Sequence, residues 1–296
     1  MLPSSIKSQG TGHTIFDPTK SSTFKTTEGS KWKISYGDSS SASGTVGTDN
    51  VTIGGLTITN QAVELANHMS DQFVQGAGDG LLGLGWGSIN TVTPKPVQTT
   101  VENMITEDTI PETAELFTVN LGSWRDAKES DKGESFYTFG YIDQATVTAS
   151  GQEIAYTPID NSQGFWMFDS TSATVNGTTI NQSGNTAIAD TGTTLALVAD
   201  ATCEAIYKAI PGATYDSTQQ GWIFPSTTTA DQLPVVTFAV GDTQFAVQKE
   251  DLGFADAGNG MVYGGIQSRG TMTFDILGDT FLKGIYAVSY SLLRNS

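Results

Sequence analysis

Short β-rich apolar runs, separated by turn residues, make up most of this chain. Residues 32–36, 117–121 and 136–140 are examples, and each run ends at or just before a glycine. Glycine accounts for 33 of the 296 residues, and serine and threonine are also abundant. Short runs of this kind, bounded by turn residues, are typical of strands in all-β proteins. The sequence therefore predicts an all-β fold with few, short helices.

The first half of the chain contains a clear hairpin pattern. Residues 32–36 are predicted to form a strand that enters a turn at Gly37, and residues 44–53 are predicted to form the returning strand. Two short helices are predicted at residues 97–104 and 199–210, the second ending before a Pro-Gly pair.

The length of the chain leaves room for two compact lobes. A polar stretch at residues 143–152 separates the two β-rich halves. We therefore expect an N-terminal lobe at residues 1–150 and a C-terminal lobe at residues 151–296.

Charge and cysteine content exclude several classes of function. The formal net charge is −17, from 31 acidic and 14 basic residues, which disfavours partners such as nucleic acid and anionic membranes. No apolar run is long enough to span a bilayer, and the first residues lack the pattern of a signal peptide. Cys203 is the single cysteine, so no intrachain disulfide can form, and we expect a buried structural thiol. The two histidines, His13 and His68, belong to no recognisable catalytic or metal-binding motif.

One motif carries chemistry. Asp190-Thr191-Gly192 follows the apolar residues 187–189 and precedes two further threonine hydroxyl groups, Thr193 and Thr194. Glycine allows a tight turn beside the carboxylate, and the hydroxyl groups can hydrogen-bond to neighbouring backbone. The pattern predicts a carboxylate that is held rigidly at the end of a buried strand.

Two apolar-apolar-glycine segments accompany this motif, Leu81-Leu82-Gly83 and Ile276-Leu277-Gly278. With these segments, the Asp-Thr-Gly loop and the hairpin around Tyr36, the chain resembles the pepsin-like aspartic proteases, and most closely the secreted fungal members. The resemblance extends from about residue 15 to about residue 288. It implies a bilobal fold in which each lobe has an Asp-Thr-Gly loop and a later apolar-apolar-glycine segment behind it.

The resemblance also implies an activity, hydrolysis of internal peptide bonds at acid pH by two carboxylates that share a proton and activate a water. It makes Asp190 a catalytic residue. Residues that bind substrate would be Tyr36, Gly37 and Asp38 of the hairpin, with Gly192, Thr193 and Thr194 of the loop. The implied ligand is a polypeptide substrate or a pepstatin-like peptide inhibitor. No cofactor or metal is implied, and the implied location is extracellular.

The partner of Asp190 is not evident in the sequence. Gly278 lies 88 residues after Asp190, and counting 88 residues back from Gly83 passes the first residue. The first half has no Asp-Thr-Gly or Asp-Ser-Gly, and Asp17 is followed by a proline in a polar turn. We therefore expect an incomplete first lobe, truncated at its N-terminus relative to the family, that lacks the first catalytic aspartate.

Three alternatives follow from this expectation. The chain could be an active endopeptidase whose second carboxylate comes from a homodimer or from a separate N-terminal fragment. It could be a catalytically inactive pepsin-fold protein that binds peptides or acts as an inhibitor. It could also be a truncated product with unpaired sheet edges.

Ser39 is a further departure from the family pattern, because relatives often have glycine at this position. A positive φ would strain serine there by about 1 kcal/mol.

Overall fold

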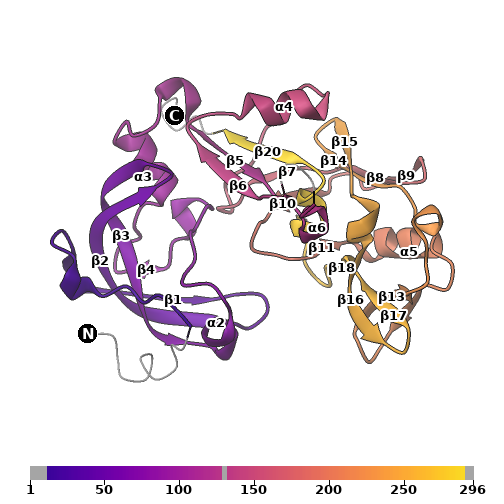
Figure 1. Ribbon diagram of the computed structural model, residues 1–296, viewed down its shortest axis with the longest axis horizontal. Coiled ribbons are helices and arrows are strands. Elements are labelled where there is room, and N and C mark those ends of the chain that lie inside the picture. Colours follow the sequence, from indigo (N-terminus) through magenta and orange to yellow (C-terminus); the bar gives the residue numbers. More distant parts are fainter. Residues whose placement is uncertain (1–11, 129–131, 291–296) are drawn as a thin grey trace. The chain divides into compact units, whose positions relative to one another are not determined.

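The computed structural model of the chain describes residues 12–128 and 132–290 (Figure 1). The chain forms two compact units, with the division between Glu115 and Leu116. The division lies N-terminal to the boundary predicted near residue 150, which remains a prediction about the functional lobes. The polar stretch at residues 143–152 contains a helix, α4 (Gln144–Ser150), whose N-cap is Asp143.

The first unit is a four-stranded antiparallel sheet in the order β3-β2-β1-β4. In β1 the side chains alternate, so that Trp32 and Ile34 pack on the core side while Lys31 and Lys33 remain exposed. Strand β2 contains Gly44, where a Cβ would lie 1.7 Å from the carbonyl oxygen of Leu65. The elements are β1 (Lys25–Ser35), β2 (Ser41–Ile53), β3 (Leu56–Met69), β4 (Val92–Thr93), α2 (Asp71–Gln75) and α3 (Thr100–Thr106).

The second unit is built around a five-stranded mixed sheet in the order β18-β11-β19-β10-β7, accompanied by three smaller antiparallel sheets. Phe238 and Phe281, both almost fully buried, meet edge to face in its core. The strands of the mixed sheet are β7 (Met167–Asp169), β10 (Thr186–Ala189), β11 (Ala196–Val198), β18 (Ile266–Ser268) and β19 (Asp275–Leu277).

The three smaller sheets and the helices complete the second unit. One sheet has the order β20-β5-β6, with β5 (Leu116–Asn120), β6 (Phe136–Phe139) and β20 (Tyr286–Tyr290). Another has the order β15-β14-β8-β9, with β8 (Ser172–Val175), β9 (Thr178–Asn181), β14 (Val236–Val240) and β15 (Thr243–Ala246). The last has the order β12-β13-β17-β16, with β12 (Thr214–Asp216), β13 (Gly221–Pro225), β16 (Gly253–Gly258) and β17 (Met261–Gly264). Helices α5 (Asp200–Lys208) and α6 (Asp279–Leu282) are short.

This architecture confirms the predicted all-β fold with few, short helices. The predicted hairpin is formed by β1 and β2, and the helix predicted at residues 199–210 is α5. The helix predicted at residues 97–104 begins later, as α3, because Thr99 and Glu102 form a capping box. Cys203 is fully buried in α5, and burial raises the pKa of its thiol to about 12, as expected of a structural cysteine. Among the described residues, no helix has the length and apolar character needed to cross a membrane.

Candidate active site

Asp190 lies where the buried strand β10 ends. Ala187 and Ile188 of β10 are almost fully buried, and the strand pairs in parallel with β19 and antiparallel with β7. The backbone N–H of Asp190 donates to the carbonyl oxygen of Leu277 at 3.2 Å, so the parallel pairing extends to the aspartate itself. The paired strand β10 therefore fixes the position of Asp190 at the start of the loop.

Both carboxylate oxygens of Asp190 accept hydrogen bonds from its own loop. The backbone N–H of Gly192 donates to Oδ1 at 2.9 Å, and the hydroxyl of Thr193 donates to Oδ2 at 2.7 Å. Two donors on one carboxylate fix its orientation. The loop therefore holds the Asp190 carboxylate in one position.

The segment after β19 packs tightly against the same loop. At Gly278 a Cβ would lie 2.1 Å from the carbonyl oxygen of Thr193 and 2.3 Å from that of Leu195, so only glycine fits. The backbone N–H groups of the next two residues donate to the carbonyl oxygens of Thr193 and Thr194, at 2.8 and 3.0 Å. The Ile276-Leu277-Gly278 segment thus supports the Asp-Thr-Gly loop from behind.

Asp279 is a second carboxyl group close to Asp190, and it was not among the site residues predicted from the sequence. Its pKa is raised to about 6, chiefly by burial and further by the negative charge of Asp190, while Lys283 acts in the opposite direction. Within the described part of the chain, its buried Oδ1 atom has no hydrogen-bond partner. The sequence feature that could have identified Asp279 is its position directly after the Ile276-Leu277-Gly278 segment.

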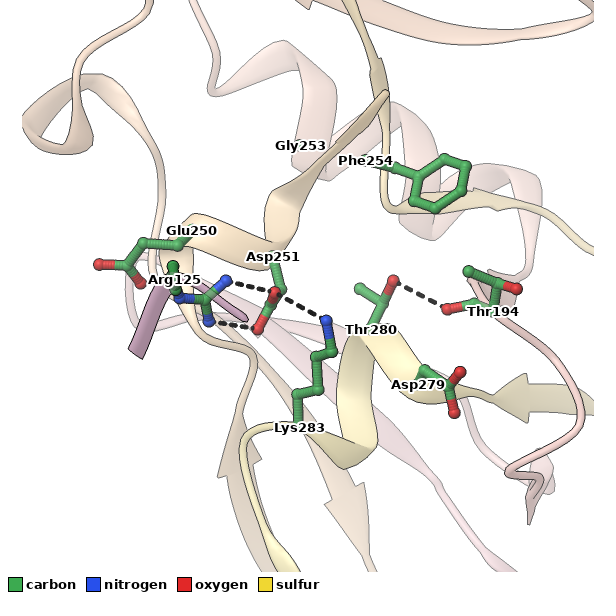
Figure 2. Close-up of a pocket in the computed structure, with 9 residues that line it drawn as sticks. All are labelled: Arg125, Thr194, Glu250, Asp251, Gly253, Phe254, Asp279, Thr280 and Lys283. Atoms are coloured by element: carbon green, nitrogen blue, oxygen red, sulfur yellow. Dashed lines mark hydrogen bonds and ion pairs between the residues drawn. The ribbon is translucent and has the colours of Figure 1, made fainter. Parts of the chain in front are cut away.

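A cavity of about 290 Å³ in the second unit adjoins this carboxyl group (Figure 2). Asp251, which is 8% exposed, accepts two hydrogen bonds from Arg125 at 2.7 and 2.8 Å, and Lys283 approaches it at 3.9 Å. The hydroxyl of Thr280 donates to the carbonyl oxygen of Thr194 at 3.2 Å. The lining residues are Arg125, Thr194, Glu250, Asp251, Gly253, Phe254, Asp279, Thr280 and Lys283. The cavity is therefore lined by both acidic and basic side chains, and Thr194 of the Asp190 loop forms part of its wall.

A buried carboxylate, a partly buried arginine and an asparagine also join the starting ends of β10 and β19. Asp275, fully buried, accepts from Arg269 at 2.6 Å and from the side chain of Asn185 at 2.8 Å. Arg269 also donates to Asn185 at 2.7 Å. The two parallel strands that end at Asp190 and Gly278 are thus tied together where they begin. Sequence reasoning missed this cluster because Asn185 lies 84 residues or more from the other two members and no sequence pattern links the three.

The hairpin residues predicted to bind substrate lie in the first unit. The N–H of Tyr36 donates to the carbonyl oxygen of Ser40 at 2.9 Å, which closes the turn that contains Gly37. Tyr36 packs edge to face on Phe73, and burial, followed by Glu64, raises its pKa. Hydrogen bonds from Ser40 lower the pKa of Asp38.

Ser39 has a φ of 67°, so the positive φ considered for this position is present. The strain expected for serine there therefore applies.

The predicted site residues fall into two groups. Asp190, Gly192, Thr193 and Thr194 form one continuous loop of the second unit, and Tyr36, Gly37 and Asp38 form one turn of the first. Each group has an ordered local structure of its own.

The first-half counterpart of the supporting segment has a different environment. Leu81 and Leu82 lie outside any strand and are 71% and 45% exposed. Gly83 has open space where a Cβ would stand, in contrast to Gly278. Within the described residues of the first unit, this segment therefore lacks the tight packing of its counterpart.

Known proteins resemble nearly the whole chain. The family profile of the eukaryotic aspartyl proteases matches residues 3–295. Aspergillopepsin-1 of Aspergillus oryzae is 43% identical over 282 residues, which cover 95% of this chain and 67% of that protein. Penicillopepsin-1 of Talaromyces stipitatus is 40% identical, over 96% of this chain and 68% of its own length.

A solved structure also resembles this fold. The aspartic proteinase from Irpex lacteus superposes with a TM-score of 0.73 at 27% identity, over 95% of this chain and 84% of that one. The chain spans about two thirds of the length of the curated relatives named above. Its sequence and fold agree, and the chain belongs to the eukaryotic aspartyl protease family.

Proposed function

We propose that this chain is the major part of an aspartic endopeptidase, which hydrolyses internal peptide bonds of polypeptides at acid pH. The observation that carries the proposal is the doubly hydrogen-bonded carboxylate of Asp190, held at the end of a buried strand. The match to the family profile and to fungal aspartic proteases supports it.

In the proposed reaction, one ionised carboxylate removes a proton from a water molecule, which then attacks the peptide carbonyl carbon. A second, protonated carboxyl group polarises the carbonyl oxygen. Asp190 would be one member of this pair. Thr193 orients Asp190, and Gly192 and Thr194 present backbone groups of the loop. Tyr36, Gly37 and Asp38 would cover the bound peptide from the hairpin.

The second carboxylate is the open element of the proposal, because the sequence contains a single Asp-Thr-Gly. We consider two sources: a second copy of this chain, or a separate polypeptide that supplies the loop of the first lobe. A homodimer predicts specific activity that rises with protein concentration. A separate polypeptide predicts that the purified chain is inactive until that polypeptide is added.

The decisive experiment measures cleavage of a denatured protein at about pH 4, with and without pepstatin. Once the second carboxylate is supplied by either source, we expect cleavage that pepstatin blocks and that Asp190→Asn abolishes, while the exposed Asp242→Asn leaves it unchanged. Cleavage that survives Asp190→Asn would overturn the proposal.

The acidic composition and the family resemblance also lead us to propose an extracellular site of action. Secretion of the full gene product from its host would test this location.

The alternative function is peptide binding without turnover. The exposed Leu81 and Leu82, which lack the packing of their counterparts, favour it for the isolated chain. Calorimetry with pepstatin separates the two functions, since binding without cleavage at any protein concentration would support the alternative.

A further inference from the structure

A shallow hollow on the sheet of the first unit carries two basic side chains, Lys33 and His68. It has a volume of about 180 Å³ and is lined by Lys33, Ser41, Ala42, Ser43, His68, Met69 and Ser70. Both basic side chains are exposed, and across residues 12–128 and 132–290 neither forms an ion pair. In a chain with 31 acidic residues, a hollow of this composition is unexpected.

The strand register places the two basic groups in one row. Lys33 of β1 is paired with Ser43 of β2, and Ser43 is paired with His68 of β3. Residues paired across neighbouring strands point to the same face of a sheet, so these three side chains share one face. Neighbouring strands lie about 4.8 Å apart, which puts Lys33 and His68 about 10 Å apart with the serine between them.

This separation suits a small anion. A group bound above the hydroxyl of Ser43 would lie within reach of the Lys33 ammonium from one side and the His68 imidazole from the other. Ser70 adds a further donor, because its hydroxyl oxygen already accepts from the backbone N–H of Ser41 at 3.1 Å and its proton is left to point elsewhere. Lys31, on the same face two residues before Lys33, adds positive charge.

Two of the nearby acidic groups, Glu64 and Asp49, are engaged by other partners. Glu64 of β3 is paired with Val46, a core residue of the opposite face, and accepts from Asn90 at 3.0 Å. Asp49 of β2 accepts hydrogen bonds from Thr23 and from the N–H of Asn50. The remaining ionisable groups of β1, β2, β3 and α2 are Lys25, Glu28 and Asp71, of which Asp71 directly follows the hollow.

We propose that this hollow is a pH-dependent oxyanion site, which binds a sulfate, phosphate or carboxylate group when His68 is protonated. A histidine ring is charged only when both of its nitrogens are protonated, so the row carries two facing cations in that state and one otherwise. The site therefore fills at acid pH and empties as the pH rises. It lies on the sheet whose β1–β2 hairpin carries Tyr36, and it is independent of the function proposed for Asp190.

Linkage makes the site testable without any measurement of activity. An anion that binds the protonated form more tightly than the neutral form must raise the midpoint of the His68 titration. Inorganic sulfate is a suitable probe because its charge is constant over this range. The other histidine, His13, serves as an internal control because its ring is engaged by Asp79 and Val74 and it does not line the hollow.

The experiment follows the imidazole signals of both histidines by NMR during a pH titration, in sulfate and in chloride at matched ionic strength. We expect sulfate to raise the His68 midpoint by about 0.3–0.5 unit, a two- to threefold preference for the protonated form, and to leave the His13 midpoint unchanged. Lys33→Gln should abolish the shift, whereas Lys249→Gln, in the second unit, should not.

Equal shifts of both histidines, or a His68 shift that persists in Lys33→Gln, would overturn the proposal. A second arm replaces sulfate with a blocked glutamyl peptide and then with free acetate. A larger shift with the peptide identifies a carboxylate side chain of a polypeptide as the ligand, and equal shifts identify a free oxyanion. No shift with any of the three anions would also overturn the proposal.

Discussion

Among the individual residues, Ser39 is the clearest case of local strain. Its φ of 67° lies in the left-handed region, which costs a non-glycine residue about 1 kcal/mol or more. The side chain lies at the tip of the hairpin that carries Tyr36 and Asp38, so the strain is located in a turn proposed to contact substrate.

Replacing Ser39 with glycine should therefore stabilise the first unit. The relief of strain exceeds the entropy that glycine adds to the unfolded chain, and we expect a net gain of about 0.5 kcal/mol in the free energy of unfolding. Urea denaturation measures this gain. Ser123→Gly is the control, because Ser123 has a φ of −129° and glycine there should lower stability. A Ser39→Gly variant less stable than the parent chain would contradict the argument.

Asp279 predicts a pH dependence of stability. Its pKa of about 6 in the folded chain exceeds the ordinary value of 3.8, so the folded chain holds a proton that the unfolded chain releases between these values. The stability it contributes is complete below about pH 4 and is lost as the pH rises to about 6. After allowance for solvent screening the loss is about 1–2 kcal/mol.

Asp279→Asn should remove this loss and flatten the stability profile of the second unit between pH 4 and 6. Thermal unfolding monitored at several pH values tests it, with Asp231→Asn as an exposed control. Because the charge of Asp190 contributes to the raised pKa, Asp190→Asn should shift the same profile to lower pH. An unchanged profile in Asp279→Asn would contradict the assignment.

Among the larger elements, the two apolar-apolar-glycine segments differ in what surrounds them. Gly278 is enclosed by the carbonyl oxygens of the Asp190 loop, whereas Gly83 faces open space. The internal repeat was recognisable from sequence, since both segments have the same residue pattern. Their different packing was not, because it depends on which strands lie beside each segment.

Alanine substitution should lower stability strongly at Gly278 and hardly at all at Gly83. Gly278→Ala places a Cβ 2.1 Å from the carbonyl oxygen of Thr193, so we expect a loss of about 3 kcal/mol or more and displacement of the Asp190 loop. Gly83→Ala should change the stability of the isolated chain by less than about 0.5 kcal/mol. Chemical denaturation measures both. A costly Gly83→Ala would show that another strand packs on this segment in solution.

The Asp275–Arg269 ion pair leads to a prediction about the stability of the second unit. Removing one partner leaves a buried charge, so Arg269→Met should cost about 3–5 kcal/mol. Adding Asp275→Asn to that variant should recover part of the loss, because the unpaired charge is then absent. The double-mutant cycle is measured by urea denaturation, and strictly additive losses would argue against the pair.

For the chain as a whole, the sequence predicted the fold class and the loop chemistry, but not the side-chain networks. Alternation and turn residues indicated the strands, and the Asp-Thr-Gly loop with its apolar flank indicated a rigid carboxylate, as found at Asp190. The raised pKa of Asp279 and the Arg125–Asp251 pair depend on burial by residues that are distant in sequence. Such contacts leave no local pattern.

The net charge of −17 also acts on the entire chain. Repulsion between carboxylates opposes the compact state, and salt screens it. We expect added sodium chloride to raise the melting temperature more at about pH 7 than at about pH 4, where part of the charge is titrated. Calorimetry at both pH values tests this, and an equal salt effect at both would contradict it.

Cys203 gives the second unit a built-in reporter. The thiol is fully inaccessible in α5, and its pKa of about 12 keeps it protonated, so a thiol reagent cannot reach it in the closed state. Its rate of chemical labelling, divided by that of the unfolded chain, therefore gives the fraction of time for which this helix is open. Because the chain has no other cysteine, a mass shift of one label reports the opening of the core behind Asp190 directly.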